Sequence, residues 1–243
     1  MARSFREAGH LPKQRPDGRP AAPEGLPRQR AGRTPQMHGR YPDYDVLAEA
    51  RHWDPVTRDL LESRVRDVPA LRVFDAGQAA CLHAFLDVVL AQDAEPRIPV
   101  LEMVDAEFAA GRLDGYRYVD MPPDPVTWQQ VAALLDRTAR GRGAPGFAAL
   151  GPEAQEAVVA AFATGDLDGE GLDVSRAWSV VMRGALGAFY SHPWAFNEIG
   201  FGGPAYPRGY MRLQPGADGR EPRERPEAFE EDPVTDVPRR GLR

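Results

Sequence analysis

The chain has 243 residues, a formal net charge of −6 and a single cysteine, Cys81. One cysteine excludes an internal disulfide, a cysteine zinc cluster and a C-x-x-C-H haem site within this chain. The sequence has no apolar run of about 18 residues, so we expect no membrane-spanning helix.

Residues 1–40 differ in composition from the rest of the chain. They contain six prolines and nine basic residues against three acidic ones, a net charge of +6, so the remaining residues sum to −12. With few large apolar side chains, this segment cannot bury enough surface to offset its loss of chain entropy, and we expect a disordered basic arm. Its charges are spaced by prolines without an aromatic platform, which favours a solvated tail over a nucleic-acid or lipid contact.

The same segment bears on the cellular compartment. It has no apolar stretch of the kind found in a signal peptide, and the Arg239-Arg240 pair lies at the other end of the chain. We therefore expect a cytoplasmic protein. The alternative is export to the periplasm or the cell surface in complex with a partner that carries its own signal.

Two helices are predicted in the first part of the body. Asp54-Pro55 supplies an N-cap and a proline at the first helical position, which predicts a helix that ends near residue 65. A second helix is expected to begin near Asp75 and to bury one apolar face. The residues of that face are Leu82, Phe85, Leu86, Val89 and Leu90. Beside it, Cys81 is expected in the core and His83 at the surface or its edge.

Four more helices are predicted over residues 99–111, 124–141, 152–165 and 173–192. Each begins at a proline or a capping aspartate and ends at a glycine or before a proline. Their buried faces are expected to hold Val100, Val104, Phe108, Trp128, Val131, Leu134, Leu135, Val158, Val159, Phe162, Trp178, Val181, Met182, Ala185 and Phe189. A loop over residues 113–123 is expected to pack Tyr116, Tyr118 and Met121 on the domain. Six helical patterns and no alternating strand predict one all-α domain over residues 41–213.

Residues 190–210 form the least regular stretch of the body. They include six aromatic residues, four glycines and three prolines. Because proline removes backbone donors and glycine weakens both helix and strand, we expect an aromatic loop here. Aromatic side chains are the usual anchors of cores and of partner contacts. After it, residues 214–243 combine five prolines with eight acidic residues and six arginines, and we expect a second disordered tail.

Two patterns in the body fall short of the sites that they suggest. Gly200-x-Gly202-x-x-Ala205 fits a dinucleotide pattern, but that site needs a strand before it and a helix after it. Here a helix is expected before the pattern, and Pro204 and Pro207 oppose a helix after it. The acidic residues 166–173 lack the central glycine and closing glutamate of a calcium loop. A solvated turn, with Asp173 as a helix cap, is favoured.

The polar residues of the aromatic loop allow two interpretations. In the first, His192, Asn197, Glu198 and Arg208 satisfy backbone groups of the loop or pair across it. In the second, His192 and Glu198 act with Asp45 or Asp54 in a stand-alone small enzyme or metal-binding protein. No periodicity places a nucleophile, a base and an orienting group on one face, which favours the first interpretation. The aromatic residues Trp194, Phe196, Phe201, Tyr206 and Tyr210 are expected either in the core or against a partner.

The aromatic stretch carries a family resemblance. Residues 191–194 read S-H-P-W and residues 197–210 read N-E-I-G-F-G-G-P-A-Y-P-R-G-Y. Together they resemble the C-terminal signature of the gluconate 2-dehydrogenase subunit 3 family, with Phe196 where many members have tryptophan. Weaker similarity reaches back over residues 40–42, 45–47, 52–54 and 93–100, so the resemblance spans residues 40–213.

The resemblance implies an accessory role. Members are similar to small subunits that support the folding, export or stability of a large FAD-binding dehydrogenase of the glucose-methanol-choline type. The large subunit oxidises a sugar, sugar acid or polyol, and a cytochrome c subunit commonly accepts the electrons. FAD is then expected in the partner and no cofactor in this chain. Many small subunits of this family carry a twin-arginine export signal, which residues 1–40 do not contain.

The resemblance also directs attention to a set of partner-binding residues. These are His192, Trp194, Asn197, Glu198, Phe201, Tyr206, Arg208 and Tyr210. The favoured hypothesis is therefore a non-catalytic accessory subunit, with no nucleic acid and no membrane span. The stand-alone enzyme or metal-binding protein, and a nucleic-acid contact through residues 1–40, remain the alternatives.

Overall fold

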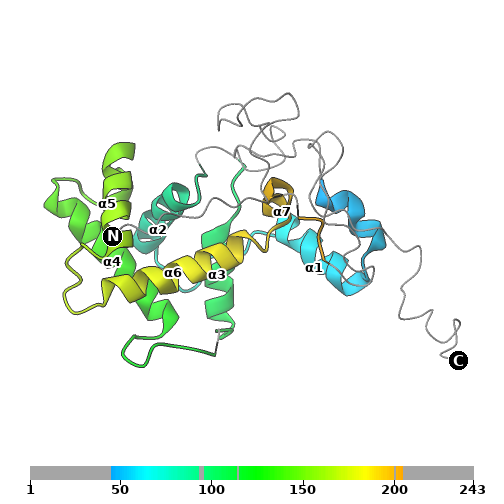
Figure 1. Ribbon diagram of the computed structural model, residues 1–243, viewed down its shortest axis with the longest axis horizontal. Coiled ribbons are helices and arrows are strands. Elements are labelled where there is room, and N and C mark those ends of the chain that lie inside the picture. Colours follow the sequence, from blue (N-terminus) through cyan, green and yellow to red (C-terminus); the bar gives the residue numbers. More distant parts are fainter. Residues whose placement is uncertain (1–44, 93–95, 114, 200, 205–243) are drawn as a thin grey trace, which may run out of the picture.

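The computed structural model describes residues 45–92, 96–113, 115–199 and 201–204 (Figure 1). In these residues the chain forms seven α-helices and two short 3-10 helices and no strand, which confirms the all-α prediction. The expected arm over residues 1–40 and the expected tail over residues 214–243 lie outside the described part of the chain. The elements in order are η2 (Val46–His52), α1 (Pro55–Arg66), α2 (Ala76–Val89), α3 (Val100–Ala109), α4 (Asp124–Gly141), η3 (Phe147–Ala149), α5 (Pro152–Thr164), α6 (Val174–Phe189) and α7 (Pro193–Ile199).

Capping aspartates begin three of these helices where the sequence predicts them. Asp54 Oδ1 accepts hydrogen bonds from the N–H groups of Val56 and Thr57, at 3.0 and 3.1 Å. Asp75 and Gln78 form a reciprocal capping box at the start of α2. Asp173 accepts from the N–H of Arg176 at the start of α6.

The prediction that Asp124 caps α4 is wrong. Asp124 is already the first helical residue of α4, and Pro123 precedes it without a side-chain hydrogen bond. The carboxylate of Asp124 instead accepts a hydrogen bond from Arg183 Nη2 of α6, at 3.2 Å. This pair joins the N-terminus of α4 to α6, and a carboxylate in the first turn also suits the helix dipole.

Helices α2 to α6 enclose the main hydrophobic core. Helix α6 contacts α3, α4 and α5, and α2 contacts α3, α4 and α5. The largest fully buried side chains of this core are Trp128, Phe85, Phe147, Phe162 and Phe189. The apolar faces predicted from helical periodicity are therefore the faces that pack, and Cys81 lies in the core among them as expected.

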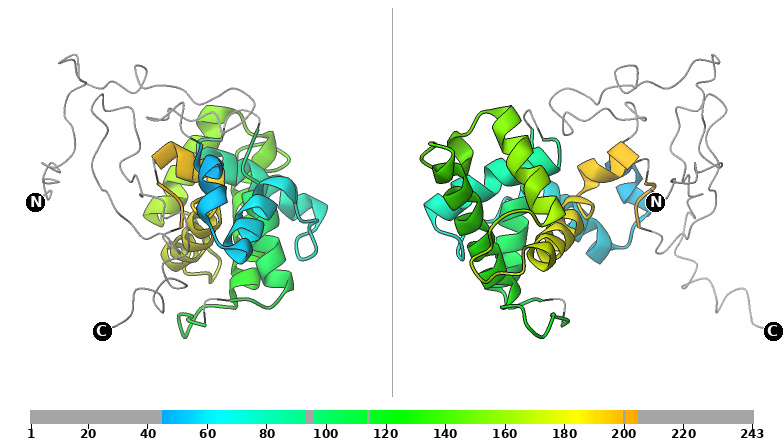
Figure 2. Two further views of the ribbon diagram at one scale, coloured as in Figure 1. Left: turned by 90° about the vertical axis from the view of Figure 1, so that its right-hand side faces the viewer. Right: turned by 60° about the vertical axis from the view of Figure 1, so that its left-hand side comes forward.

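A second, smaller core lies at one end of the molecule, where η2, α1 and α7 pack on one another (Figure 2). Its buried members are Val46, Ala50, Trp53, Leu61 and Phe196. Helix α7 follows directly from α6, so it brings the end of the described chain against the beginning. Residues nearly 150 positions apart thus share this core.

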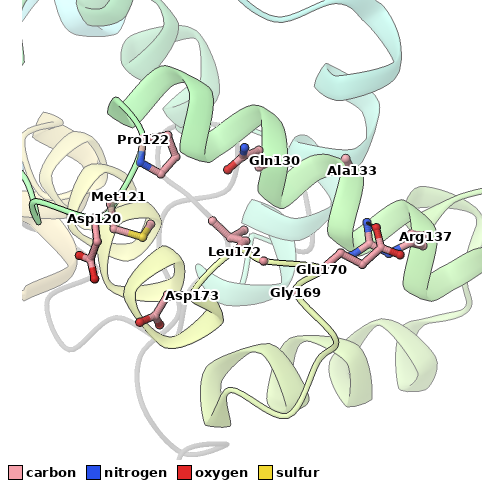
Figure 3. Close-up of a pocket in the computed structure, with 11 residues that line it drawn as sticks. Asp120, Met121, Pro122, Gln130, Ala133, Arg137, Gly169, Glu170, Leu172 and Asp173 are labelled. Carbon is pink, nitrogen blue, oxygen red and sulfur yellow. Dashed lines mark ion pairs between the residues drawn. The ribbon is translucent and has the colours of Figure 1, made fainter.

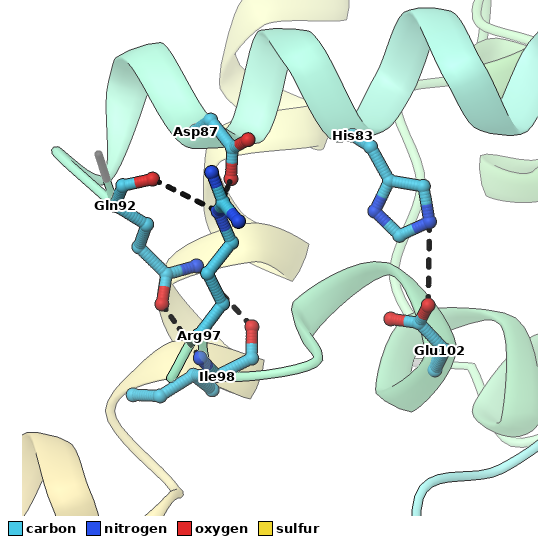
Figure 4. A network of polar contacts seen from close by, with 6 residues as sticks. All are labelled: His83, Asp87, Gln92, Arg97, Ile98 and Glu102. Atoms are coloured by element: carbon cyan, nitrogen blue, oxygen red, sulfur yellow. Dashed lines mark hydrogen bonds and ion pairs between the residues drawn. The ribbon is translucent and has the colours of Figure 1, made fainter. Parts of the chain in front are cut away.

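The connection between α2 and α3 is closed by a side-chain amide (Figure 4). Gln92 is buried, and its Oε1 accepts from the Ile98 N–H at 2.7 Å while its Nε2 donates to the Ile98 carbonyl at 3.2 Å. Arg97 Nε lies 3.1 Å from Asp87 and 3.0 Å from the Gln92 carbonyl. The same view shows His83 facing Glu102, 3.2 Å away. The His83 side chain is 46% exposed, as expected for a residue at the surface or its edge.

The prediction that the loop before α4 packs on the domain is confirmed for Met121 and Tyr118. Met121 is buried in the main core and Tyr118 is partly buried against it, whereas Tyr116 is 55% exposed. Two arginines of α6 also contact the tyrosine rings, with Arg176 above Tyr118 and Arg183 above Tyr116 at 5.3 and 5.4 Å from the ring centroids. Cation–π contacts of this kind let an aromatic ring pack on a helix without entering the core.

Candidate functional site

The stretch that the sequence predicts to be a loop contains a helix. Helix α6 ends at Phe189, and Pro193 begins the seven-residue helix α7. A proline at the first helical position loses nothing, because the N–H that it lacks would have no partner within the helix. Residues 193–199 contain no glycine, and the glycines of this stretch all follow Ile199. The expectation of an irregular loop is therefore wrong for residues 193–199.

His192 lies in the turn between α6 and α7 and faces α1. Its side chain is 1% exposed. The N–H of Trp194 donates to Nδ1 at 3.2 Å, so the ring proton is on Nε2, which donates to the Arg64 carbonyl at 2.9 Å. Burial lowers the pKa of His192 to about 4, and the imidazole is neutral at neutral pH.

Arg64 completes a reciprocal pair of hydrogen bonds with this turn. Its Nη1 donates to the Ser191 carbonyl at 2.6 Å, while its own carbonyl accepts from His192. Both bonds satisfy backbone carbonyls near helix ends that have no partner within their own helix. They fix the end of α1 to the turn that leads into α7.

Asn197 makes a second link, between α7 and η2. Its side chain is buried, and Oδ1 accepts from the Val46 N–H at 2.8 Å. Val46 is the first residue of η2, so Asn197 supplies an acceptor to a backbone donor at the beginning of that helix. The expectation that His192 and Asn197 would serve the aromatic stretch itself is therefore wrong in part. Their main partners, Arg64 and Val46, are in the N-terminal part of the body.

Phe196, Phe201 and Gly203 close the second core over Trp53. The rings of Phe196 and Phe201 meet edge to face, with centroids 4.9 Å apart. Gly203 has a φ of +87°, and a Cβ at this position would lie 2.8 Å from Val46 Cγ2 and 3.0 Å from Trp53 Cζ2. Only glycine combines this backbone conformation with this close approach.

Five of the eight predicted partner-binding residues lie in the described part of the chain, one of them with its backbone only. His192 and Asn197 are buried, Trp194 is partly buried on the main core with its ring 4.9 Å from that of His192, and Phe201 packs on the second core. Glu198 belongs to α7, although its side chain lies outside the described part of the chain. Tyr206, Arg208 and Tyr210 also lie outside it.

Three of the residues proposed for the alternative catalytic or metal site, His192, Asp45 and Asp54, are engaged in backbone hydrogen bonds. Both ring nitrogens of His192 are occupied by hydrogen bonds to the backbone. Asp45 caps η2 by accepting from the Leu47 N–H, and Asp54 caps α1. In the residues that the structure describes, no group of three or more His, Cys, Asp or Glu side chains could hold a metal ion.

The acidic residues 166–173 form a turn that borders an open pocket of about 410 Å³ on α4 (Figure 3). Asp168 accepts from the Glu170 N–H at 3.1 Å, and Glu170 pairs with Arg137 of α4 at 3.2 Å. Asp120, on the opposite wall, pairs with Arg176. Arg176, which is not among the residues that line the pocket, also pairs with Asp173. The turn and the Asp173 cap agree with the prediction of an acidic turn followed by a helix cap.

Asp105 is a buried polar residue that the sequence prediction does not include. Asp105 in α3 is 0% exposed, and its carboxylate accepts from the N–H groups of Arg72, Val73 and Phe74 at 2.7, 2.8 and 3.0 Å. It thereby fixes the segment that leads into α2. Helical spacing could have identified it, because Asp105 is four residues after Leu101 and lies on the same buried face.

Several large apolar side chains are exposed on the second core and on the helix that leads into it. Of the ten that are exposed in the described part of the chain, three are on α1 and α7: Val56, Leu60 and Ile199. Two more lie at the end of α6, from which the chain continues into α7: Leu186 and Tyr190. None of the described helices is both long enough and apolar enough to cross a bilayer.

Comparison with known proteins gives one match. A family model described as gluconate 2-dehydrogenase subunit 3 matches residues 76–203, just over half of the 243-residue chain. The match begins at the first residue of α2 and ends at Gly203, so it includes α7 but neither η2 nor α1. No curated protein and no solved structure matches the chain.

Proposed function

The chain belongs to the gluconate 2-dehydrogenase subunit 3 family, and we propose on this basis that it is a non-catalytic accessory subunit. Its partner is a large FAD-dependent dehydrogenase of the glucose-methanol-choline type that oxidises a sugar, sugar acid or polyol. The FAD belongs to the partner, and a cytochrome c subunit is the expected electron acceptor in complexes that contain one. The small subunit binds the flavoprotein and stabilises it.

The main support for this proposal is that the polar residues of the signature have structural roles in the fold. His192 and Asn197 hold α7 against α1 and η2 through backbone hydrogen bonds. A catalytic imidazole needs a ring nitrogen within reach of a substrate proton, whereas His192 is buried with both nitrogens bonded. These buried residues hold neighbouring elements in place, which supports a structural and binding role for this part of the chain over an acid–base role.

The surface beside the second core is apolar because it exposes large hydrophobic side chains. Tyr190 at the end of α6 is 44% exposed and Ile199 at the end of α7 is 50% exposed. Aromatic and large aliphatic side chains are the usual anchors of protein interfaces. We place the contact with the flavoprotein on this end of the molecule, next to Trp194 and Phe201.

The compartment follows from the partner in this proposal. We expect the complex in the cytoplasm, or in the periplasm or at the cell surface if the chain is exported bound to the flavoprotein. Fractionation of the source cells, with detection of the tagged chain in each fraction, distinguishes these locations.

Purification of the tagged full-length chain from its source tests the proposal. A yellow flavoprotein should be recovered with it, and the complex should oxidise a sugar or polyol with a dye acceptor. A gene for a glucose-methanol-choline oxidoreductase next to the gene for this chain would identify the candidate partner. Recovery of the chain as a stable monomer without flavin contradicts the proposal.

A further inference from the structure

The main core and the second core draw on different parts of the chain. The main core has twenty-nine buried side chains, and among the described residues none of these comes from η2 or α1. The second core has five, and four of them come from this first part of the chain: Val46, Ala50, Trp53 and Leu61. We call residues 46–66, which include η2 and α1, the clasp. Its apolar packing is separate from that of the main core.

Helix α7 lies between the two cores. Ala195 belongs to the main core, and its neighbour Phe196 belongs to the second core. The two helices of the clasp pack on each other and on α7, at the end of the molecule that lies away from α4 and α5 (Figure 1). Helix α7 is thus attached to the main core on its own account, whereas the clasp is attached through α7.

The polar contacts of the clasp are concentrated at the same place. In the described residues, the hydrogen bonds between the clasp and later elements all end at Ser191, His192 or Asn197. The charge of Glu107 in α3 also acts on Arg64, but half of the Glu107 side chain is exposed, and interactions of this kind are weak. The clasp can therefore leave α7 without breaking the hydrogen bonds of the main body.

The sizes of the two cores predict the order in which they open. Hydrophobic stabilisation grows with the apolar area that is buried, so five buried side chains contribute much less than twenty-nine. The buried indole Nε1 of Trp53 also has no hydrogen-bond partner among the described residues, which weakens the second core further. Folded proteins open in cooperative units, and those with the fewest buried contacts open first.

We propose that the clasp opens from α7 as one cooperative unit while the main core stays folded. Opening breaks the hydrogen bonds at Ser191, His192 and Asn197 and uncovers the ring of Phe196. The closed clasp is thus a cover over residues of the signature, and its opening controls access to them. This device is a property of the chain itself and does not depend on the proposed dehydrogenase partner.

Native-state hydrogen exchange of the full-length chain, followed by mass spectrometry, tests the order of opening. The amides of η2 and α1 should exchange through one shared opening, whose equilibrium constant is at least about tenfold larger than that of the slowest amides in α2, α4 and α6. Equal constants for the clasp and those helices would show that the molecule opens as a whole. Clearly different constants for η2 and α1 would show two independent openings. Either result overturns the proposal.

Matched leucine substitutions separate the two openings. Leu135 is 0% exposed in the main core, and Leu61 is 3% exposed in the second core. Leu135→Ala should speed exchange of the slowest amides at least about tenfold and leave the clasp unchanged, because Leu135 keeps its contacts when only the clasp is open. Leu61→Ala should speed exchange of the clasp by a similar factor. Val158→Ala replaces Leu135→Ala if that variant does not fold. Faster exchange of the clasp in the main-core variant overturns the proposal.

Thiol modification gives an independent readout. Cys81 is the only cysteine of the chain and is buried in the main core, so its reaction with a thiol reagent reports the opening of that core. Val46→Cys adds a thiol in the second core, at a position that is 0% exposed. The new thiol should react at least about tenfold faster than Cys81, and Leu135→Ala should speed the reaction of Cys81 alone. A common rate for the two thiols overturns the proposal.

Discussion

The imidazole of His192 donates from Nε2 to the carbonyl oxygen of Arg64 at 2.9 Å, and the Arg64 side chain returns a hydrogen bond to the carbonyl of Ser191, the neighbour of His192. This exchange connects residues 128 positions apart. It also connects α1, which precedes the segment matched by the family model, to the turn before α7, which lies within it. The second core is held together by this pair and by the bond from Val46 to Asn197.

His192→Ala should destabilise the protein by about 2–4 kcal/mol. The substitution removes a fully buried ring and leaves the Arg64 carbonyl and the Trp194 N–H without their partners. Urea denaturation measures the change. His83→Ala is the matched control, because His83 is half-exposed and makes a surface pair with Glu102, and its loss should cost well under about 1 kcal/mol.

Stability should fall as the pH is lowered from about 6.5 towards 4. The fold lowers the pKa of His192 to about 4, whereas an unfolded histidine titrates near 6.5, so the unfolded chain binds the extra proton between these values. The contribution is fully present above the unfolded pKa and amounts to about 3 kcal/mol at most. Denaturation across this range measures it. In His192→Gln this component of the pH dependence should disappear, and an unchanged profile would contradict the assignment.

Asp105→Ala should lower the free energy of unfolding by about 3–5 kcal/mol, because three buried backbone N–H groups lose their acceptor at once. Thermal unfolding followed by circular dichroism measures the loss. Asp59 is a suitable control, since its side chain is 74% exposed, and Asp59→Ala should change the stability by no more than about 0.5 kcal/mol. Equal effects of the two substitutions would show that Asp105 does not anchor the segment before α2.

Gly203→Ala should destabilise the second core by about 2–4 kcal/mol through two separable effects. The positive φ strains any side chain, and the new Cβ would meet Val46 and Trp53. Gly115 also has a positive φ, +67°, but open space around it. Gly115→Ala therefore measures the conformational strain alone, about 1 kcal/mol. If both variants lose the same stability, the contact of Gly203 with Trp53 contributes nothing.

The proposed contact surface predicts a selective loss of binding. Tyr190→Asp with Ile199→Asp places two charges among the exposed apolar side chains beside the second core, and it should reduce recovery of the flavoprotein at least tenfold. Val119 is 97% exposed in the loop before α4, and Val119→Asp should leave recovery unchanged. Circular dichroism of each variant confirms that the fold is intact. If Val119→Asp reduces recovery and the double variant does not, the contact lies on that loop and not beside the second core.

Local signals in the sequence predict most of the helical body. Asp54, Asp75 and Asp173 mark helix starts because a capping side chain acts within three residues of its own position. Helical periodicity likewise identifies the buried faces around Phe85 and Trp128. These signals need no knowledge of the tertiary structure.

The second core could not be predicted in the same way, because its contacts join distant residues. Nothing near His192 or Asn197 in the sequence indicates that their partners are Arg64 and Val46. Composition does not reveal helix α7, because the glycines and prolines that follow Ile199 dominate the composition of the whole stretch. Only the arrangement of α1, η2 and α7 in space reveals what these side chains do.

The central claim is that this chain supports a flavoenzyme and carries out no oxidation itself. The most direct measurement is dye-linked turnover of sugars, sugar acids and polyols by the purified chain alone, by the partner dehydrogenase alone and by the two co-expressed. The account predicts no turnover by the chain alone, and a larger yield of soluble, flavin-loaded, active partner when the chain is present. Turnover by the isolated chain, or a partner whose yield and activity are the same without it, would contradict the account.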